Sequence, residues 1–345
     1  MSPPSEARNT PGMLRRDVLG GAAAIAGAAL LANPAALAAG ETSALPSIAN
    51  DADLERALPA LSNWGRWGAA DQLGTLNFTS AATKLAAAAL IRSGRVVSLA
   101  REFSPSTPEL RNFSYAMKRY EDPLPEEAGC YDVVGMTCHG FAITHLDALC
   151  HVFTPAGAQG MYNGFSVADV TPAGAVRLGI EHVAEAGIVG RGVLLDVAEV
   201  RGAPLAPGSA IMLEDLEAAE RLHGVWVGEG DILFVRNGGG PGNTYKHGTG
   251  LHASCLPWLR DRRVAVLSSD SDNDIHPAQP GFERWSEPMH MVGIAYMGLT
   301  LLDQTELDGI AAACADERRW DFFVTVAPWR MKGATGSAVN PLAMF

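Results

Sequence analysis

Short apolar runs bounded by glycine and charged residues recur along the chain and predict buried β-strands. They occupy residues 96–99, 192–197, 231–236, 264–267 and 322–326, and each contains β-branched residues. Runs of this length and composition are more typical of strands than of helices. The chain therefore supplies several strands that are apolar on both faces.

Segments with helical spacing of apolar residues alternate with these runs. Alanine and leucine recur at helical intervals over residues 80–94, acidic residues mark the wetter side of residues 213–222, and residues 253–260 form a third helical segment. No linker rich in Pro, Gly or Ser divides residues 51–345. The pattern predicts an α/β fold, as a single domain with a mixed β-sheet flanked by helices.

Residues 1–38 have the order of an export signal. Arg15 and Arg16 precede an alanine-rich apolar run at residues 22–31, and small residues follow at 36–38. The run is shorter than the roughly 20 residues that a transmembrane helix needs, so we expect a cleaved signal peptide and no stable membrane anchor. The paired arginines favour the twin-arginine route and a periplasmic or secreted protein. A general secretory signal or a cytosolic alanine-rich tail is the alternative.

The remainder reads as a short lead-in followed by the folded domain. Residues 39–50 are polar and predict little structure of their own, and we expect the domain to occupy residues 51–345. The net charge of −12, without a run of Lys or Arg in the body, argues against a nucleic-acid partner. The five cysteines are too few and too scattered for a disulfide framework.

The densest chemical segment lies between residues 139 and 151. It holds His139, His145, Asp147 and His151, which are three of the nine histidines beside one carboxylate. Imidazole and carboxylate ligands together suit Zn²⁺, Mn²⁺ or Fe²⁺. In an extended strand, residues two apart share a face, so His139, His145 and Asp147 would face one ion. His151 suits a general acid/base beside it.

This segment also carries a family resemblance. Thr144-His145-x-Asp147-x-x-x-His151 resembles the signature H-x-G-T-H-x-D-x-P-x-H of the cyclase family, which includes kynurenine formamidases and isatin hydrolase. The resemblance implies a cyclase-like, swivelling β/β/α fold, metal ligands at His145 and Asp147, and a catalytic acid/base at His151.

The chain departs from that signature at its first half. Phe141, which cannot bind metal, stands where the family has its first ligand, and Ile143 and Leu149 replace the Gly and Pro of the signature. We predict that His139 substitutes as a metal ligand, through a bulge in the strand. In compact relatives a distant His and Glu complete a two-metal site; the corresponding residues here are His290 and Asp303, of which we rank His290 higher as a ligand.

The resemblance extends over residues 64–345 and is closer to the longer family members, whose substrates are mostly unassigned. It rests on three further segments: Trp67-Gly68-x-x-Asp71-Gln72-Leu73-Gly74-Thr75-Leu76-Asn77, Tyr162-Asn163-Gly164 and Gly336-Ser337-x-x-Asn340-Pro341. It implies a divalent metal cofactor, Mn²⁺ or Zn²⁺, with one or two ions, a small-molecule substrate and a homo-oligomer, expected to be a dimer.

The implied activity is hydrolysis of an amide, a formamide (arylformamidase-like) or a cyclic amide or ester. Two rivals stay open: an exported small-molecule binding protein without turnover, suggested by Phe141, and a lactone or cyclic-imide hydrolase unrelated to tryptophan breakdown. A thiol nucleophile at Cys150 is disfavoured because neighbours on a strand, such as His151, face opposite ways. We interpret residues 237–242 as a loop over the site and residues 268–272 as a turn of capping side chains rather than a Ca²⁺ loop.

Overall fold

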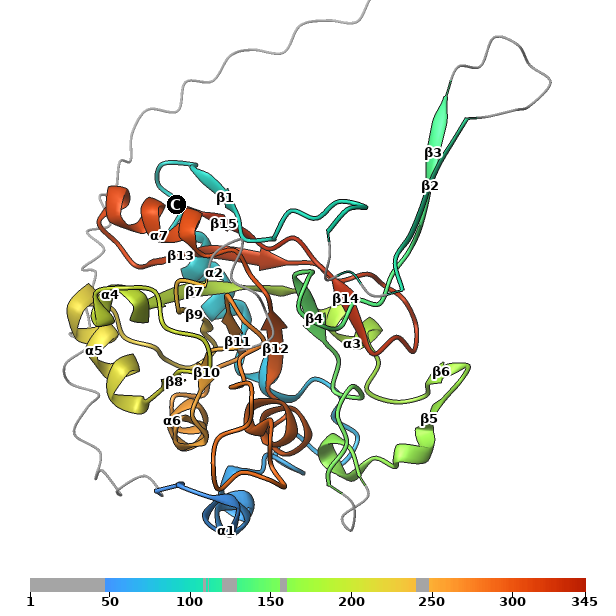
Figure 1. Ribbon diagram of the computed structural model, residues 1–345, viewed down its shortest axis with the longest axis horizontal. Helices are drawn as coiled ribbons and strands as arrows, with labels where there is room; N and C mark the ends of the chain where they lie inside the picture. Colours follow the sequence, from blue (N-terminus) through green and yellow to red (C-terminus); the bar gives the residue numbers. More distant parts are fainter. Residues whose placement is uncertain (1–46, 108–109, 111, 120–128, 156–159, 240–247) are drawn as a thin grey trace, which may run out of the picture. The chain divides into compact units, whose positions relative to one another are not determined.

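A nine-stranded sheet forms the centre of the domain in a computed structural model of the chain (Figure 1). The structure describes residues 47–107, 110, 112–119, 129–155, 160–239 and 248–345. The strand order is β1-β15-β13-β7-β9-β11-β12-β4-β14. The strands of this sheet are β1 (Val96–Ser98), β4 (His145–Asp147), β7 (Ile188–Asp196), β9 (Ile232–Arg236), β11 (Val266–Ser269), β12 (Thr300–Asp303), β13 (Asp321–Val326), β14 (Gly336–Ala338) and β15 (Leu342–Met344).

The middle of the sheet is parallel and both sides are antiparallel. β7, β9, β11 and β12 run parallel to their neighbours in this group, whereas β4 and β14 on one side, and β13, β15 and β1 on the other, pair antiparallel. The register sets Asp303, at the end of β12, opposite His145 at the start of β4. Ligands of open α/β sheets bind outside the carboxyl ends of parallel strands. A site is therefore expected at the carboxyl end of β12.

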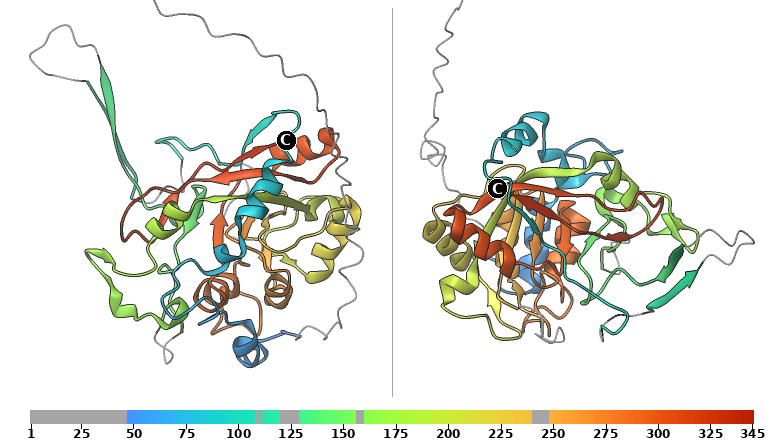
Figure 2. Two further views of the ribbon diagram at one scale, coloured as in Figure 1. Left: turned by 180° about the vertical axis from the view of Figure 1, so that it is seen from behind. Right: turned by 90° about the horizontal axis from the view of Figure 1, so that it is seen from above.

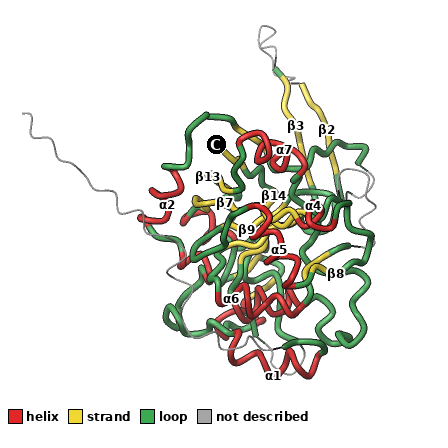
Figure 3. The backbone as a smooth tube through the Cα atoms, turned by 90° about the vertical axis from the view of Figure 1, so that its left-hand side faces the viewer, coloured by secondary structure: helices red, strands yellow, loops and turns green. Residues whose placement is uncertain are grey.

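Helices pack on the sheet and on one another. α2 contacts β7 and β13, α5 contacts β7, and the π-helix η7 contacts β12. Figure 3 shows α1 and α6 at the same end of the domain, where both contact η7. The helices are α1 (Asp51–Leu61), α2 (Ala81–Ala88), α3 (Ile180–Ala186), α4 (Val197–Arg201), α5 (Leu213–His223), α6 (Leu256–Asp261), η7 (Met289–Met297) and α7 (Asp308–Glu317), with 3₁₀ turns η2 (Gly74–Phe78), η3 (Tyr162–Gly164), η4 (Val167–Asp169) and η6 (Ala253–Cys255).

The parallel strands are buried, as their composition predicts. Every residue of β11 and β12 is buried, as are Ile232–Val235 within β9. Parallel strands that are covered on both faces have continuous apolar sequences. For this reason the sequence predicts strands at residues 231–236 and 264–267. The prediction of a single α/β domain with a mixed sheet and flanking helices is confirmed.

The expected helix at residues 80–94 is shorter in the structure. It begins at the predicted place because the Ser80 hydroxyl accepts the Thr83 amide at 3.1 Å, while the Thr83 hydroxyl accepts the Ser80 amide at 2.8 Å. It ends at Ala88. The amides of Ser93 and Gly94 instead donate to the carbonyl of Phe345, so a tertiary contact competes with continuation of the helix.

The prediction of one extended strand through residues 139–151 is wrong. Only His145–Asp147 forms a strand, and residues 139–143 follow a bent loop that includes Gly140 at φ +122°. His139 therefore reaches the site from a loop rather than from a bulged strand. His145 and Asp147 do share one face of β4, as the two-residue period requires.

Three two-stranded sheets stand outside the main sheet, and one of them is an extended hairpin. β2 (Ser114–Arg119) pairs with β3 (Cys130–Gly135), and Figure 2 shows the pair reaching away from the main sheet in both views. Every residue of the two strands is exposed except the half-buried Gly135. The other two sheets are β5 (Val170–Thr171) with β6 (Gly174–Ala175), and β8 (Ala210–Ile211) with β10 (Gly250–Leu251).

Some sequence predictions fall outside the described residues. These are the signal peptide at 1–38, most of the lead-in at 39–50, and part of the glycine-rich loop at 237–242. Within the described ranges, no helix is long and apolar enough to cross a membrane.

Candidate metal centre

Three buried side chains and one half-buried side chain, from three elements, converge at the carboxyl end of β12. β4 supplies His145 and Asp147, the adjacent β12 supplies Asp303, and η7 supplies His290. His145, Asp147 and Asp303 are each at most 2% exposed, and the His290 side chain is 12% exposed. We refer to His145, Asp147, His290 and Asp303 as the four-residue centre.

The potential ligand atoms of the four-residue centre face one another. Nε2 of His145 lies 3.7 Å from Oδ1 of Asp147 and 3.7 Å from Oδ2 of Asp303. Nε2 of His290 lies 3.4 Å from Oδ2 of Asp147 and 3.2 Å from Oδ2 of Asp303. His145, Asp147 and Asp303 are spaced so that one ion can contact all three. The structure thus places Asp303 as centrally as His290, and gives no reason to rank it lower.

The second ring nitrogen of each of these histidines is already bonded. Nδ1 of His145 donates to the carbonyl of Ile143 at 2.8 Å, and Nδ1 of His290 donates to Oδ2 of Asp274 at 2.7 Å. In His145 a proton on Nδ1 leaves the Nε2 lone pair directed into the centre, whereas Nε2 of His290 donates to Oδ2 of Asp303 at 3.2 Å. Protein metal sites commonly orient their histidines in this way.

One oxygen of the Asp147 carboxylate lacks a hydrogen-bond partner. Oδ2 is buried and accepts no hydrogen bond among the described residues. Burial raises the pKa of Asp147, but His151, His139, His290 and His145 outweigh it and hold the pKa well below its ordinary value. A buried, ionised carboxylate oxygen is costly unless a cation or donor compensates it, so the donor set fits a divalent metal ion.

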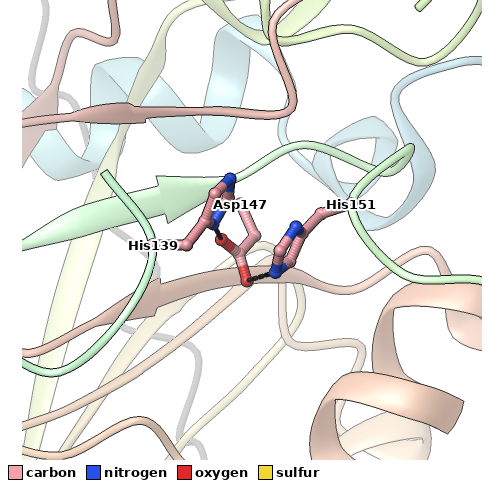
Figure 4. A group of neighbouring side chains, drawn as sticks. All are labelled: His139, Asp147 and His151. Atoms are coloured by element: carbon pink, nitrogen blue, oxygen red, sulfur yellow. Dashed lines mark hydrogen bonds and ion pairs between the residues drawn. The ribbon is translucent and has the colours of Figure 1, made fainter. Parts of the chain in front are cut away.

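His139 and His151 also approach the carboxylate of Asp147, as Figure 4 shows. Nδ1 of His139 is 2.9 Å from Oδ1 of Asp147, and Nε2 of His151 is 3.9 Å from Oδ2. The two imidazole rings stack in parallel with their centroids 3.7 Å apart. These three residues form a second group that could hold an ion, with Asp147 shared between the groups.

Both ring nitrogens of His139 have partners in this structure. Besides Asp147, its Nε2 lies 3.0 Å from the hydroxyl of Thr335. The ring fits because Gly336 has no side chain: a Cβ there would lie 2.6 Å from Cε1 of His139 and 2.7 Å from the carbonyl of Leu146. A role as metal ligand would require His139 to exchange these bonds, so the prediction that it replaces the missing family ligand stays a prediction.

His151 is a neutral, partly exposed imidazole beside Asp147. Burial lowers the pKa of His151 to about 4, with contributions from neighbouring histidines and against the effect of Asp147. The ring is therefore neutral at neutral pH and able to accept a proton. Its side chain is 28% exposed, so a small molecule can reach it.

Sequence reasoning missed two residues that support the centre. Asp274 accepts Nδ1 of His290, and Asn273 donates to Oδ1 of Asp303 at 2.6 Å. Both follow β11, directly after residues 268–272, which were interpreted as a turn of capping side chains. That interpretation agrees with Asp270, whose carboxylate accepts the amides of Asn237 and Gly238. A run of polar residues at the carboxyl end of a buried parallel strand was the available signal.

The remaining predicted features are structural in this fold. Cys150 is buried, burial raises the pKa of its thiol to about 12, and its sulfur is directed to the carbonyl of Ala334. Phe141 lies edge-on to His276 at 5.7 Å between ring centroids. In the wider motifs, Asp71 accepts the hydroxyl of Tyr162 at 2.9 Å, which joins two of the motif segments.

The fold and this site together define an α/β protein with a buried His/Asp centre at a sheet edge. The chain belongs to the Cyclase family, whose model matches residues 87–273. The structure of a novel cyclase is similar at TM-score 0.73 and 28% identity, covering 82% of this chain and 99% of that one. No curated protein matches the chain.

Two isatin hydrolases share the fold at lower similarity. One is isatin hydrolase A from Labrenzia aggregata bound to benzyl benzoate, at TM-score 0.51 and 18% identity, covering 76% of this chain and 98% of that one. The other is an isatin hydrolase bound to the product analogue thioisatinate, at TM-score 0.50 and 17% identity, covering 77% and 98%. At these identities the likeness concerns the fold.

Proposed function

We propose that the chain is a metal-dependent hydrolase that cleaves an amide, a formamide or a cyclic amide or ester. The observation that carries the proposal is Oδ2 of Asp147, which is buried among imidazole and carboxylate groups and accepts no hydrogen bond from the described residues. His145, Asp147, His290 and Asp303 would hold Mn²⁺ or Zn²⁺, since both metals accept mixed nitrogen and oxygen ligands. His139 is the remaining ligand candidate.

The residues of the chain divide the chemistry between them. A bound divalent ion supplies a Lewis acid that polarises the carbonyl group and makes water more acidic. The neutral ring of His151 accepts the proton of the attacking water and returns it to the leaving nitrogen or oxygen, so a C–O bond forms and the C–N or C–O ester bond breaks. His139 stacks on His151 and limits rotation of its ring. No covalent enzyme intermediate is needed.

Aromatic amides and isatin are the first substrates to test. Isatin is named for two proteins with this fold, and an N-formyl aromatic amine represents the arylformamidase-like activity. Phe141 stands at the position of a family ligand and cannot bind metal. The first alternative is therefore a protein of the same fold that binds a small molecule without turning it over. A lactone or cyclic imide as the true substrate is the second alternative, which a substrate panel separates.

The deciding experiment measures metal and activity together. We expect purified protein to contain Mn²⁺ or Zn²⁺ by elemental analysis and to hydrolyse at least one substrate of the panel. Asp147→Asn keeps the side-chain shape but removes the charge. It should lose the metal and reduce kcat/KM by more than about 100-fold, because even residues that only orient ligands cost 10- to 100-fold.

The matched control is Asp316→Asn on α7, where the side chain is 69% exposed and pairs with Arg95. It should keep wild-type metal content and activity. Wild-type protein that binds no metal and hydrolyses nothing in the panel, yet binds a small molecule, would establish the binding-protein alternative instead.

We further propose that the chain forms a homodimer and that the β2–β3 hairpin is part of its interface. One face of the hairpin carries the side chains of Tyr115, Met117 and Val134. The opposite face carries the paired residues Ala116 and Val133. Tyr115 is 44%, Met117 54% and Val133 48% exposed. An isolated two-stranded hairpin is marginally stable in water, so a second copy that covers both faces would stabilise it.

A further inference from the structure

Three successive side chains after β11 have three different partners, two of which belong to the four-residue centre. Asp272, Asn273 and Asp274 are 7%, 0% and 0% exposed. We call these three residues the support loop. None belongs to the four-residue centre, yet two of them bond directly to its members.

Asp274 holds the start of η7 and the ring of His290 at once. Its Oδ2 accepts the backbone amide of His290 at 3.0 Å and Nδ1 of the same residue at 2.7 Å, while Oδ1 accepts the amide of Met289 at 2.9 Å. These bonds fix the position of the residue and keep a proton on Nδ1. Nε2 is thereby directed at Asp147 and Asp303.

Asn273 orients the carboxylate of Asp303 on β12. Its amide group donates to Oδ1 of Asp303 at 2.6 Å, which leaves Oδ2 to face His145 and His290. The backbone of Asn273 has φ +65°, a left-handed conformation that asparagine tolerates better than most residues. Because of this turn, the adjacent side chains of Asn273 and Asp274 bond to two different members of the centre, Asp303 and His290.

Asp272 faces a different partner. Its Oδ2 lies 2.5 Å from Nε2 of His276, and within the described part of the chain it forms no hydrogen bond or ion pair with the four-residue centre. The support loop therefore contains its own comparison: two side chains that bond to the centre, and a third buried one, Asp272, that bonds to His276 instead.

We propose that Asp274 and Asn273 are positioning residues that set the metal affinity of the four-residue centre without binding the ion. The inference rests on the proposed function in that it requires the centre to bind a metal. Outer-shell partners of metal ligands typically contribute 10- to 100-fold in affinity, because they hold each ligand in its binding orientation before the ion arrives.

The test is a metal titration of chelator-treated protein by calorimetry, with Mn²⁺ and Zn²⁺ as probes. Asp274→Asn and Asn273→Gly should each weaken binding by about 10- to 100-fold. Glycine keeps the left-handed backbone at 273 while removing the amide group. Binding is measured well below the melting temperature of each metal-free variant, so that a loss of stability does not register as a loss of affinity.

Activity at increasing metal concentration is the second readout. If the two residues act through metal affinity, saturating metal should restore most of kcat in both variants. The matched control is Asp272→Asn, which should bind metal as the wild type does.

The outcomes separate this inference from the function on which it rests. Wild-type affinity in both Asp274→Asn and Asn273→Gly, in a protein that binds metal and hydrolyses substrate, would overturn the positioning role alone. Equal loss in Asp272→Asn would also overturn it, because the effect would then belong to the fold of the loop. A wild-type protein that takes up neither ion would refute the metal-dependent function and this role together.

Discussion

Asp147 is the residue on which the interactions of the candidate centre converge. His139 lies 2.9 Å from Oδ1, while His290 and His151 lie 3.4 and 3.9 Å from Oδ2. A single carboxylate thus connects the side that would hold a metal with the side that would move protons. Changes at Asp147 should affect both functions, whereas changes at His151 should affect only proton transfer.

Substitution of His151 tests that separation. His151→Gln keeps a polar side chain but cannot act as an acid or base, so we expect kcat to fall by about 10²- to 10⁴-fold. Metal content should stay at the wild-type value because the four-residue centre is intact. Steady-state kinetics and elemental analysis of the same preparation measure both quantities.

His182→Gln is the control, since His182 lies on α3 and belongs to neither group of potential ligands. Its kcat should be unchanged. If His151→Gln lost the metal, or kept full activity, His151 would be a ligand or a bystander rather than the acid/base.

For single residues, the sequence predicted those site positions that follow from local spacing along the chain. His145 and Asp147 share a face of one strand, and a period of two residues reveals that. The bonds from Asn273 to Asp303 and from Asp274 to His290 join segments that no local pattern relates. Such partners become visible only when the fold brings β11, β12 and η7 together.

At the scale of elements, the β2–β3 hairpin is the least covered part of the described chain. Its strands pair with each other, and its large apolar side chains are exposed on both faces. A strand pair of this kind is an aggregation hazard unless something covers it. A second copy of the chain is the partner we propose.

Charged substitutions on the hairpin test this interface. The double variant Met117→Lys with Val133→Lys places one lysine on each face, and burying either would be costly in an interface. We expect wild-type protein to be dimeric and this variant to be monomeric by light scattering after size-exclusion chromatography. Metal content should not change.

The matched control is Leu85→Lys on α2, an exposed leucine outside the hairpin at 73% exposure. It should remain dimeric. A monomeric wild type would contradict the homodimer, and a dimeric hairpin variant would place the interface elsewhere.

Strands that contain long apolar runs were easier to predict than short ones. The apolar runs that became β7, β9, β11 and β13 were recognised within a few residues of their bounds. β14 and β15 have three residues each, too few for a periodic pattern. The loop at residues 139–143 carries a strand-like sequence but bends at Gly140, where a φ of +122° is open to glycine.

At the scale of the whole molecule, the sequence predicted the class of fold but not the order of the strands. Alternating helices and strands indicate a mixed α/β sheet. The order depends on which distant segments pair, as in the pairing of β1 with β15. No alternation of polar and apolar residues contains that information.

We propose that the protein is exported, with residues 1–38 removed. N-terminal sequencing of protein recovered from the producing cell should find a first residue near Ala39, in the periplasmic or secreted fraction. Replacing Arg15 and Arg16 with lysine should retain the precursor in the cytosol if the twin-arginine route is used. Cytosolic protein that begins at Met1 would contradict export, and unaffected export of the lysine variant would favour the general secretory route.

Residues 336–344 complete both sides of the main sheet, and this has a consequence for how the chain is made. β14 covers β4 at one side, while β15 fills the gap between β13 and β1 at the other. During synthesis β1 therefore cannot pair until β15, more than two hundred residues later in the chain, has left the ribosome. Until then β4 and β13 each present an open strand edge, which is prone to association with other chains. The nascent protein should thus depend on a holding chaperone until translation has passed these last strands.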